Sequence, residues 1–321
     1  MTLVEPDTIR VLRHRRVEAV TPFRIGSLGN PSDRSYAAEL IARGQPVAAQ
    51  MFGVFGLWVR ADDRIAIDRV RKAKRERTDG PAKPFATMIS TPDFIKLIDF
   101  NAVDSKFAAM LRNGLELQRR IGALCHIRAP IKPYLVEQHD IPPLLLSYQG
   151  DQPIMQNLDP FGHSHMSNFI RAVQDRGIQF VGVTTLNDSE NEPEIIEGGK
   201  ASDRCQERGI ELLLTDYSPR RDDIRGSFAI LDISEILSWV RDGFVPANDI
   251  ETILGLTVDR SRMKPSKYRK SSFPVLDIDL DPRLQRAKVL LHIKGLNSKE
   301  IERKIGNTLR ALGKSTPVPI P

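Results

Sequence analysis

Two kinds of hydrophobic pattern alternate along the chain. Apolar residues at helical spacing predict helices, and the clearest of these cover residues 35–43, 105–121, 166–175, 247–254 and 284–294. Short apolar runs bounded by turn-forming residues predict strands, and the clearest of these cover residues 46–58, 144–147, 178–185, 210–215 and 227–232. Because the two patterns alternate without a strict strand–helix–strand rhythm, they predict an α/β domain with a mixed sheet.

The length of the chain allows a main domain flanked by two extensions. With 321 residues, there is enough chain for one large domain and additional segments. We expect an N-terminal extension over residues 1–32, a main domain over residues 33–256 and a C-terminal extension over residues 257–321. In the last segment the sequence predicts a linker at residues 268–274, a helical hairpin and a disordered tail.

Several broad protein classes do not fit this sequence. It contains no run of 18 or more apolar residues, so we expect no transmembrane helix and no membrane partner. The first residues lack the basic and apolar regions of a secretory signal. Cys125 and Cys205 lie far apart without a CxxC pair, which argues against a disulfide scaffold or a thiolate zinc site. These features together predict a cytoplasmic protein.

Positive charge is concentrated in the C-terminal extension. Residues 257–321 contain 15 Lys and Arg against 6 Asp and Glu, a net charge of +9, whereas residues 1–256 contain 32 against 35, a net charge of −3. The overall charge of +6 is therefore weak ground for nucleic-acid binding by the main domain.

The stretch from residue 70 to residue 90 combines a helix end, a cluster of cations and the start of a strand. The cations at the helix end are Arg71, Lys72, Lys74, Arg75 and Arg77. A break at residues 78–81 is followed by Lys83 and an apolar run at residues 85–89. Cations at a helix end that continue into a loop beside a strand are well placed to meet an anion such as a phosphate. By itself, the same pattern also fits a solvated basic helix end.

Other motifs favour structural roles. Neither GxxxxGK[ST] nor a GxGxxG after a strand occurs, so the two common phosphate-binding loops are absent from the sequence. His163 and His165 could supply two metal ligands, but no third ligand lies at a recognisable spacing, and a polar loop is the favoured interpretation. No function is assigned to the isolated His126, His139 and His292.

The segment Lys-Gly-Leu-Asn-Ser-Lys-Glu-Ile at residues 294–301 resembles the turn of a LuxR-type helix-turn-helix. Asn297 and Glu300 predict a capping box at the start of the second helix. The apolar face of that helix comprises Ile301, Ile305, Leu309 and Leu312. Because a well-formed third helix is missing, we favour a helical hairpin docked on the main domain over a DNA-reading unit.

Four motifs follow one another in the main domain. They are the basic helix end with Lys83-Pro-Phe85, Thr184-Thr-Leu-Asn-Asp-Ser189, Ser227-Phe-Ala-Ile-Leu-Asp232 and Arg241-Asp-Gly243. In order and separation, and with Val54-Phe-Gly-Leu57 upstream, they resemble motifs of the YrdC-like family, the threonylcarbamoyladenylate synthases. The resemblance spans about residues 33–256. It implies a YrdC-like twisted mixed sheet with flanking helices, to which a small basic helical extension is added.

That resemblance also implies an activity. The family carboxylates L-threonine with bicarbonate and adenylates the carbamate with ATP, forming threonylcarbamoyl-AMP for tRNA N6-threonylcarbamoyladenosine. The implied partners are ATP with Mg²⁺, bicarbonate and an amino acid. The residues implied to bind the nucleotide are Lys74, Arg77, Lys83, Asn187, Ser189 and Arg241, and those implied to line the amino-acid site are Thr185 and Ser227. No covalent catalytic residue and no protein metal site is expected, since positioning and charge neutralisation can carry adenylyl transfer.

The motifs that hold the amino acid in the family are poorly matched in this chain. Where the family has Pro-Thr-x-Thr, this chain has Gln50-Met-Phe-Gly53. The family's Arg-x-Pro strand, whose Arg is placed to meet the threonine carboxylate, corresponds to residues 157–160 or is absent. The loop between Arg77 and Lys83 is two residues longer. The amine substrate is therefore open, and the alternative function is a degenerate YrdC-like module that binds nucleotide or double-stranded RNA without catalysis.

Overall fold

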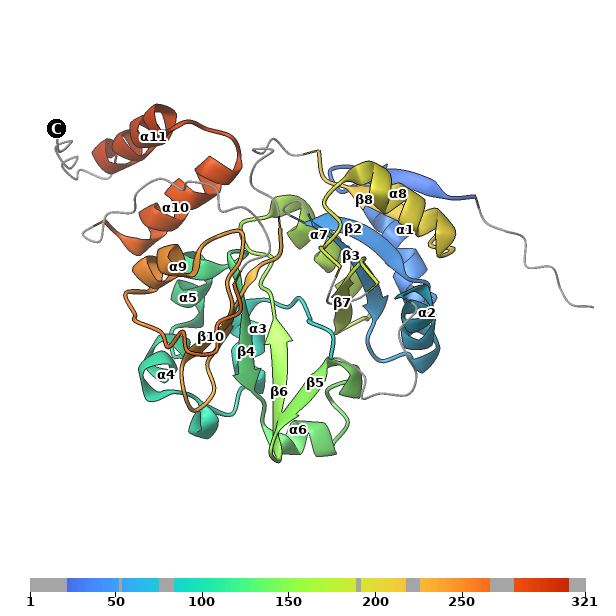
Figure 1. The fold of residues 1–321 in the computed structure, drawn as a ribbon, viewed down its shortest axis with the longest axis horizontal. Coiled ribbons are helices and arrows are strands. Elements are labelled where there is room, and N and C mark those ends of the chain that lie inside the picture. The colour runs from blue at the N-terminus through green and yellow to red at the C-terminus, as the bar shows by residue number, and fades with distance from the viewer. Residues whose placement is uncertain are drawn as a thin grey trace, which may run out of the picture.

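The structure, a computed structural model, describes residues 22–51, 54–74, 84–188, 192–217, 226–265 and 280–311 (Figure 1). In these residues the strands form two mixed five-stranded sheets. Sheet A has the order β1-β8-β2-β3-β7, with β1 at Arg24–Ser27, β8 at Leu212–Thr215, β2 at Val47–Met51, β3 at Val54–Arg60 and β7 at Val181–Thr185. Sheet B has the order β10-β9-β4-β6-β5, with β10 at Ser238–Arg241, β9 at Ala229–Asp232, β4 at Cys125–Pro130, β6 at Gln152–Asn157 and β5 at Leu146–Gln149.

Helices flank both sheets. Their bounds are α1 Pro31–Ala42, α2 Arg64–Lys74, α3 Thr91–Leu97, α4 Ser105–Leu111, α5 Gly114–Ile121, α6 Pro133–Glu137, α7 Ser164–Gln174, α8 Gly198–Glu207, α9 Ala247–Leu254, α10 Pro282–Ile293 and α11 Ser298–Ala311. Short 3₁₀ turns lie at Phe100–Ala102 and Pro143–Leu145. The mixed α/β architecture expected from the sequence is confirmed.

The segment that follows residue 83 joins the two sheets. Ala86 bridges Val183 of β7, and Thr87 bridges Asn157 of β6. Backbone hydrogen bonds of 2.7 and 3.0 Å run both ways between Ala86 and Val183. The two sheets therefore continue into each other through one extended segment and lie side by side in Figure 1.

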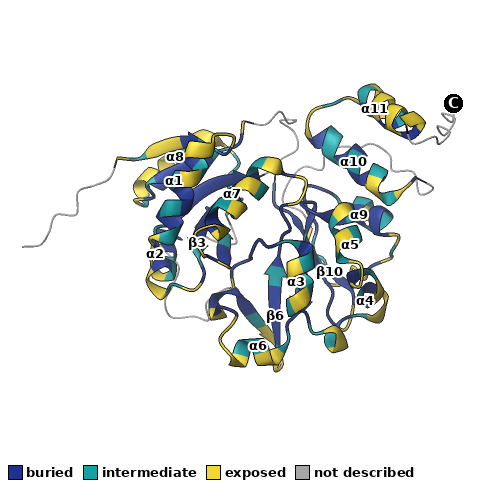
Figure 2. Cartoon of the chain, turned by 180° about the vertical axis from the view of Figure 1, so that it is seen from behind, coloured by how far each residue is buried: buried dark blue, intermediate teal, exposed yellow. Residues whose placement is uncertain are grey.

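Burial differs between the sheets. All five residues of β2 are buried, which is the pattern of a strand covered on both faces. Trp58 of β3 meets Phe169 of α7 edge to face at 5.6 Å and anchors that helix on sheet A. In β4, by contrast, Cys125 and Ile127 are buried while His126 and Arg128 are partly exposed. β4 thus has one buried face and one partly exposed face, and β6 likewise combines buried and partly exposed positions (Figure 2).

Several element boundaries differ from those expected. Residues 105–121 form two helices, because Asn113 caps α5 through a 3.2 Å hydrogen bond from the Glu116 amide. Ser90 is the N-cap of α3 and Thr91 is its first residue. Helix α8 has no counterpart among the predicted elements. β1 and the N-cap Asn30 fall inside the segment expected to be an extension, yet β1 pairs with β8, so this part belongs to sheet A.

The C-terminal helices form a hairpin that docks on the main domain through α10. Arg286 of α10 donates 2.7 Å hydrogen bonds to the carbonyls of Gly122 and Phe161. Arg283 forms an ion pair with Glu116 of α5 at 2.5 Å. The Asn297–Glu300 capping box forms in both directions at 3.0 Å. Because α11 runs without a break from Ser298 to Ala311, the described residues of this segment contain no third helix after the turn.

The described residues bear on the expected absence of a transmembrane helix and on the expected state of the two cysteines. None of the helices there is both long and apolar enough to span a membrane. Cys125 and Cys205 are free and buried, and burial raises the pKa of each thiol to about 12. A disulfide scaffold is therefore absent, as predicted. The linker at residues 268–274 and the tail after Ala311 lie outside the described residues.

Candidate functional site

The carboxyl ends of four strands meet at one edge of sheet A. β1, β8 and β2 are parallel, and β7 runs in the same direction because both β2 and β7 are antiparallel to β3. In open α/β sheets, ligands are commonly bound just beyond the carboxyl ends of strands. Thr185 is the last residue of β7 and Asn187 follows it, so both lie at this edge.

Lys74, the last residue of α2, reaches the end of β7. Its ammonium group donates to the Thr185 carbonyl at 2.7 Å and to the Thr184 hydroxyl at 3.2 Å, and the residue is only 6% exposed. The neighbouring Lys72 is exposed. At the basic end of α2, Lys74 is therefore buried against the end of β7, whereas Lys72 is exposed to solvent.

The loop that carries Asn187 is held in place by α8. Asn187 is 4% exposed, and its side-chain amide donates to the Glu192 carbonyl at 3.2 Å. The adjacent Asp188 accepts from Arg204 at 2.6 Å and from Arg208 at 2.7 Å. Thus α8, which the hydrophobic pattern did not predict, fixes one of the predicted site segments.

Ser227 and Arg241 come together on sheet B. Nε and Nη2 of Arg241 donate to the Phe228 carbonyl at 3.2 and 2.9 Å, next to the buried Ser227. The Arg241-Asp-Gly243 motif also has a structural part. Asp242 accepts from the amides of Gly243 and Ala247, and a Cβ at Gly243 would lie 2.0 Å from the Ala229 nitrogen.

One acidic residue connects the two groups. Nη1 of Arg241 lies 3.7 Å from Oε1 of Glu194, which follows the Asn187 loop. The structure therefore brings Lys74, Thr185 and Asn187 together on sheet A, brings Ser227 and Arg241 together on sheet B, and links the groups through residues 192–194. Three predicted site residues, Arg77, Lys83 and Ser189, lie outside the described residues.

The polar face of sheet B adds residues that sequence reasoning missed. His126, Ile230 and Arg241 are cross-strand neighbours in register. Nδ1 of His126 is buried although the residue as a whole is partly exposed, and this desolvation and, to a lesser extent, Arg241 lower the pKa of His126 to about 3, so this ring is neutral at ordinary pH. Arg128, two residues along the same face, lies 3.5 Å from Asp232. The sequence signal for His126 and Arg128 is the alternation of apolar and polar residues along β4, which places both side chains on the same face of the strand.

Comparison with solved structures identifies the architecture. Two structures of Sua5 from P. abyssi are similar to this chain: a doubly substituted variant, with a TM-score of 0.55 and 17% identity, and a complex with L-threonine, with a TM-score of 0.52 and 19% identity. Each match covers 74% of this chain, and covers 65% and 64% of the respective Sua5 chain. The chain has the YrdC-like fold of Sua5.

A third structure, a hypothetical protein from Streptococcus mutans, matches with a TM-score of 0.53 and 11% identity over 77% of this chain and 99% of its own. No family model matches the sequence, and no curated protein matches it. The chain therefore spans about two thirds of the length of the Sua5 chains and is similar to them in fold at low sequence identity.

Asn157 and Gln50 lie where the family resemblance places the amino-acid site. In this chain both side chains form hydrogen bonds with the chain's own backbone. Asn157 accepts from the Ile89 amide at 2.9 Å and donates to the Ile89 carbonyl at 3.0 Å. Gln50 accepts from the Asp216 amide at 3.0 Å. Both side chains are buried, at 2% and 4% exposed. These contacts give Asn157 and Gln50 structural roles at positions where the family is expected to hold its amino acid.

The His163–His165 pair gains an acidic partner from a distant part of the chain. Nε2 of His163 and Nδ1 of His165 each lie 3.1 Å from a different oxygen of Asp216, which is buried after β8. Nδ1 of His163 accepts from the Met166 amide at 3.2 Å, so its Nε2 carries the proton that Asp216 accepts. No group of His, Cys, Asp and Glu in the described part of the chain could hold a metal ion. This cluster therefore joins β8 to the start of α7 by hydrogen bonds.

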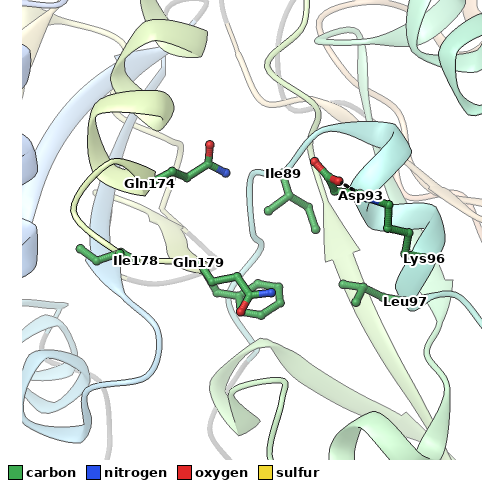
Figure 3. A pocket seen from close by; sticks show the side chains of 9 residues that line it. Ile89, Asp93, Lys96, Leu97, Gln174, Ile178 and Gln179 are labelled. Atoms are coloured by element: carbon green, nitrogen blue, oxygen red, sulfur yellow. Dashed lines mark hydrogen bonds and ion pairs between the residues drawn. The ribbon is translucent and has the colours of Figure 1, made fainter.

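A surface pocket of about 470 Å³ lies elsewhere (Figure 3). It opens between α3 and the end of α7, where Ile89, Leu97 and Gln174 line it. It contains none of the predicted site residues and lies at the amino end of β7, beside Phe180. The candidate site therefore remains with the segments of Lys74, Asn187 and Arg241, which are linked through residues 192–194.

Proposed function

We propose that this chain is an ATP-dependent enzyme that forms a carbamate from an amine and bicarbonate and adenylates it. The observation that carries the proposal is the buried ammonium group of Lys74, held 2.7 Å from the Thr185 carbonyl beside Asn187, in a chain with the fold of Sua5. A buried cation at a strand end is suited to binding an anionic ligand. The complex of Sua5 with L-threonine supports an amino acid as the amine.

The chemistry requires two bond-forming steps. The amine nitrogen attacks bicarbonate carbon and water leaves, giving a carbamate. A carbamate oxygen then attacks the α-phosphorus of ATP, and pyrophosphate leaves with the electrons of the broken bond. Lys74 and Arg241 would neutralise phosphate charge in this step, and Asn187 would donate a hydrogen bond to the nucleotide. Mg²⁺ accompanies ATP and is held largely by phosphate oxygens and water in such enzymes.

The proposed amine is an amino acid, and several amino acids are candidates. Threonine is the first candidate, and Thr185 and Ser227 would contact it. Because Gln50 and Asn157 are bound to backbone groups, the pocket for the amine differs from that of a threonine enzyme. We therefore expect an amino acid other than threonine to be accepted at least as well.

Pyrophosphate release tests the proposal. The full chain is incubated with ATP, Mg²⁺ and bicarbonate, with each of the twenty amino acids added separately. We expect release that requires both bicarbonate and at least one amino acid, and that yields an acyl-adenylate of matching mass. Release without bicarbonate would indicate ordinary amino-acid adenylation. Absence of release with every amino acid, from a protein that is folded by circular dichroism, would reject the enzyme.

A further inference from the structure

Helix α11 presents one buried face and one charged face. Ile301, Ile305 and Leu309 are at most 5% exposed and pack in a small separate core with Leu280. The opposite side of the helix is exposed and carries three cations: Lys299, Arg303 and Arg310. In Figure 1, α11 lies on the far side of α10 from α9, so this side is directed away from the main domain.

The carboxylates of α11 are already engaged within the hairpin. Glu300 accepts from the Asn297 amide in the capping box at 3.0 Å. Glu302 forms an ion pair with Lys288 of α10 at 2.8 Å. Among the described residues, no hydrogen bond or ion pair involves the side chain of Lys299 or Arg303, whereas Arg310 donates to Asn307 at 2.5 Å. The carboxylates of Glu300 and Glu302 are thus paired within the hairpin, and the exposed side of α11 is left with a positive charge.

The three cations are in line. At about 100° per residue, Lys299, Arg303 and Arg310 lie within about 40° of one another around the helix axis. At 1.5 Å per residue they extend over roughly 16 Å along it. A rigid row of this kind, with two guanidinium groups, matches a linear array of phosphates better than it matches a single small anion.

We propose that this row binds the phosphate backbone of a duplex nucleic acid. An anionic membrane surface is a poorer fit, because an interfacial helix inserts its apolar face and that face of α11 is packed against α10. Reading of base sequence is also a poorer fit, because the described part of the hairpin consists of α10 and α11 and lacks the third helix of a DNA-reading unit. The interaction is therefore expected to depend on charge, not on sequence.

Fluorescence anisotropy of labelled duplexes tests this inference on the full chain without ATP. RNA and DNA duplexes are compared, each in the same two unrelated sequences. The triple variant K299E/R303E/R310E is expected to bind both duplexes at least tenfold more weakly at about 100 mM salt, with the slope of log K against log salt reduced by about 2 to 3. The matched control K106E/R112E/R119E changes one Lys and two Arg that are exposed on and between α4 and α5, and it should stay within about threefold of the unmodified chain.

Four outcomes would overturn the inference. They are absence of duplex binding by the unmodified chain, equal losses in the two triple variants, more than tenfold preference for one duplex sequence, and binding to phosphatidylserine vesicles in place of duplexes. The variant K299Q/R303Q/R310Q guards against unfolding, since Gln keeps helix propensity. If it is folded by circular dichroism and retains full affinity, the row is not the binding surface. None of these results depends on the proposed ATP-dependent reaction.

Discussion

The two halves of the candidate site carry different kinds of polar side chain. On the nucleotide side, Lys74, Asn187 and Arg241 are anchored by carbonyl groups near strand ends. On the amino-acid side, Asn157 and Gln50 hold backbone groups of other segments. In the function proposed above, two of the three side chains on the nucleotide side are cations, whereas the amino-acid side places neutral side chains in structural hydrogen bonds.

The largest expected effect is on the nucleotide side. Lys74→Ala should reduce kcat/KM for pyrophosphate release by about 100-fold, because the desolvated charge that we propose contacts phosphate is lost. Lys72→Ala, which removes an exposed cation from the same helix, is the control and should stay near the unmodified value. Thermal denaturation of both variants separates activity from folding. Equal activity of the two variants would show that Lys74 only anchors β7.

On the amino-acid side, the expected effect is on stability. Asn157→Ala leaves the buried amide and carbonyl of Ile89 without their partners and should lower the free energy of unfolding by about 2 to 3 kcal/mol. Urea denaturation measures this, with Gln156→Ala on the same strand as the control. A small stability change together with a large rise in KM for the amine would instead make Asn157 a substrate ligand.

A smaller effect concerns pH. The pKa of His126 is about 3 in the folded protein and about 6.5 when unfolded, so between these values the unfolded chain binds more protons. Stability should therefore fall as pH is lowered from 6.5, and His126→Gln should flatten this fall by on the order of 1 kcal/mol between about pH 6.5 and 5. His139→Asn, at an exposed position with φ of 60°, is the control. Unchanged pH dependence in His126→Gln would contradict the burial of a neutral ring.

The smallest effect concerns Glu194. Its carboxylate lies 3.7 Å from Arg241 and would compete with a phosphate of the proposed nucleotide for that guanidinium group. Glu194→Gln should tighten ATP binding by about twofold, since a partly exposed ion pair contributes about 0.5 kcal/mol. Isothermal titration calorimetry can resolve this change. Weaker binding would mean that Glu194 positions Arg241 for the nucleotide.

The sequence predicted elements best where local pattern and tertiary structure agree. Residues 247–254 form α9 with the expected bounds. Helix α8 could not be predicted in the same way, because it begins with two glycines and buries only Ala201 and Cys205. β10 was not among the strands expected from the sequence, and its strand pairing depends on β9. Local signals are sufficient for long amphipathic elements and insufficient for short ones formed by pairing.

In the candidate site, too, local motifs indicated some residues, whereas contacts between distant segments could not be predicted. Motif order indicated Lys74, Asn187 and Arg241, and the structure links their segments. The partnership of Asp216 with His163 spans more than fifty residues and leaves no local signal in the sequence. The same holds for the hydrogen bonds that occupy Asn157, since its partner Ile89 lies on another segment. Contacts of this kind are decided by packing of distant elements, which the spacing of residues does not encode.

Direct binding of ATP with Mg²⁺ tests most simply whether Lys74, Asn187 and Arg241 form a nucleotide site. Isothermal titration calorimetry would compare the unmodified chain with Lys74→Ala and Lys72→Ala. We expect the unmodified chain and Lys72→Ala to bind one ATP with similar affinity, and Lys74→Ala to bind at least tenfold more weakly, a loss of about 1.4 kcal/mol or more. Absence of ATP binding by the folded, unmodified chain, or equal binding by all three proteins, would contradict this expectation.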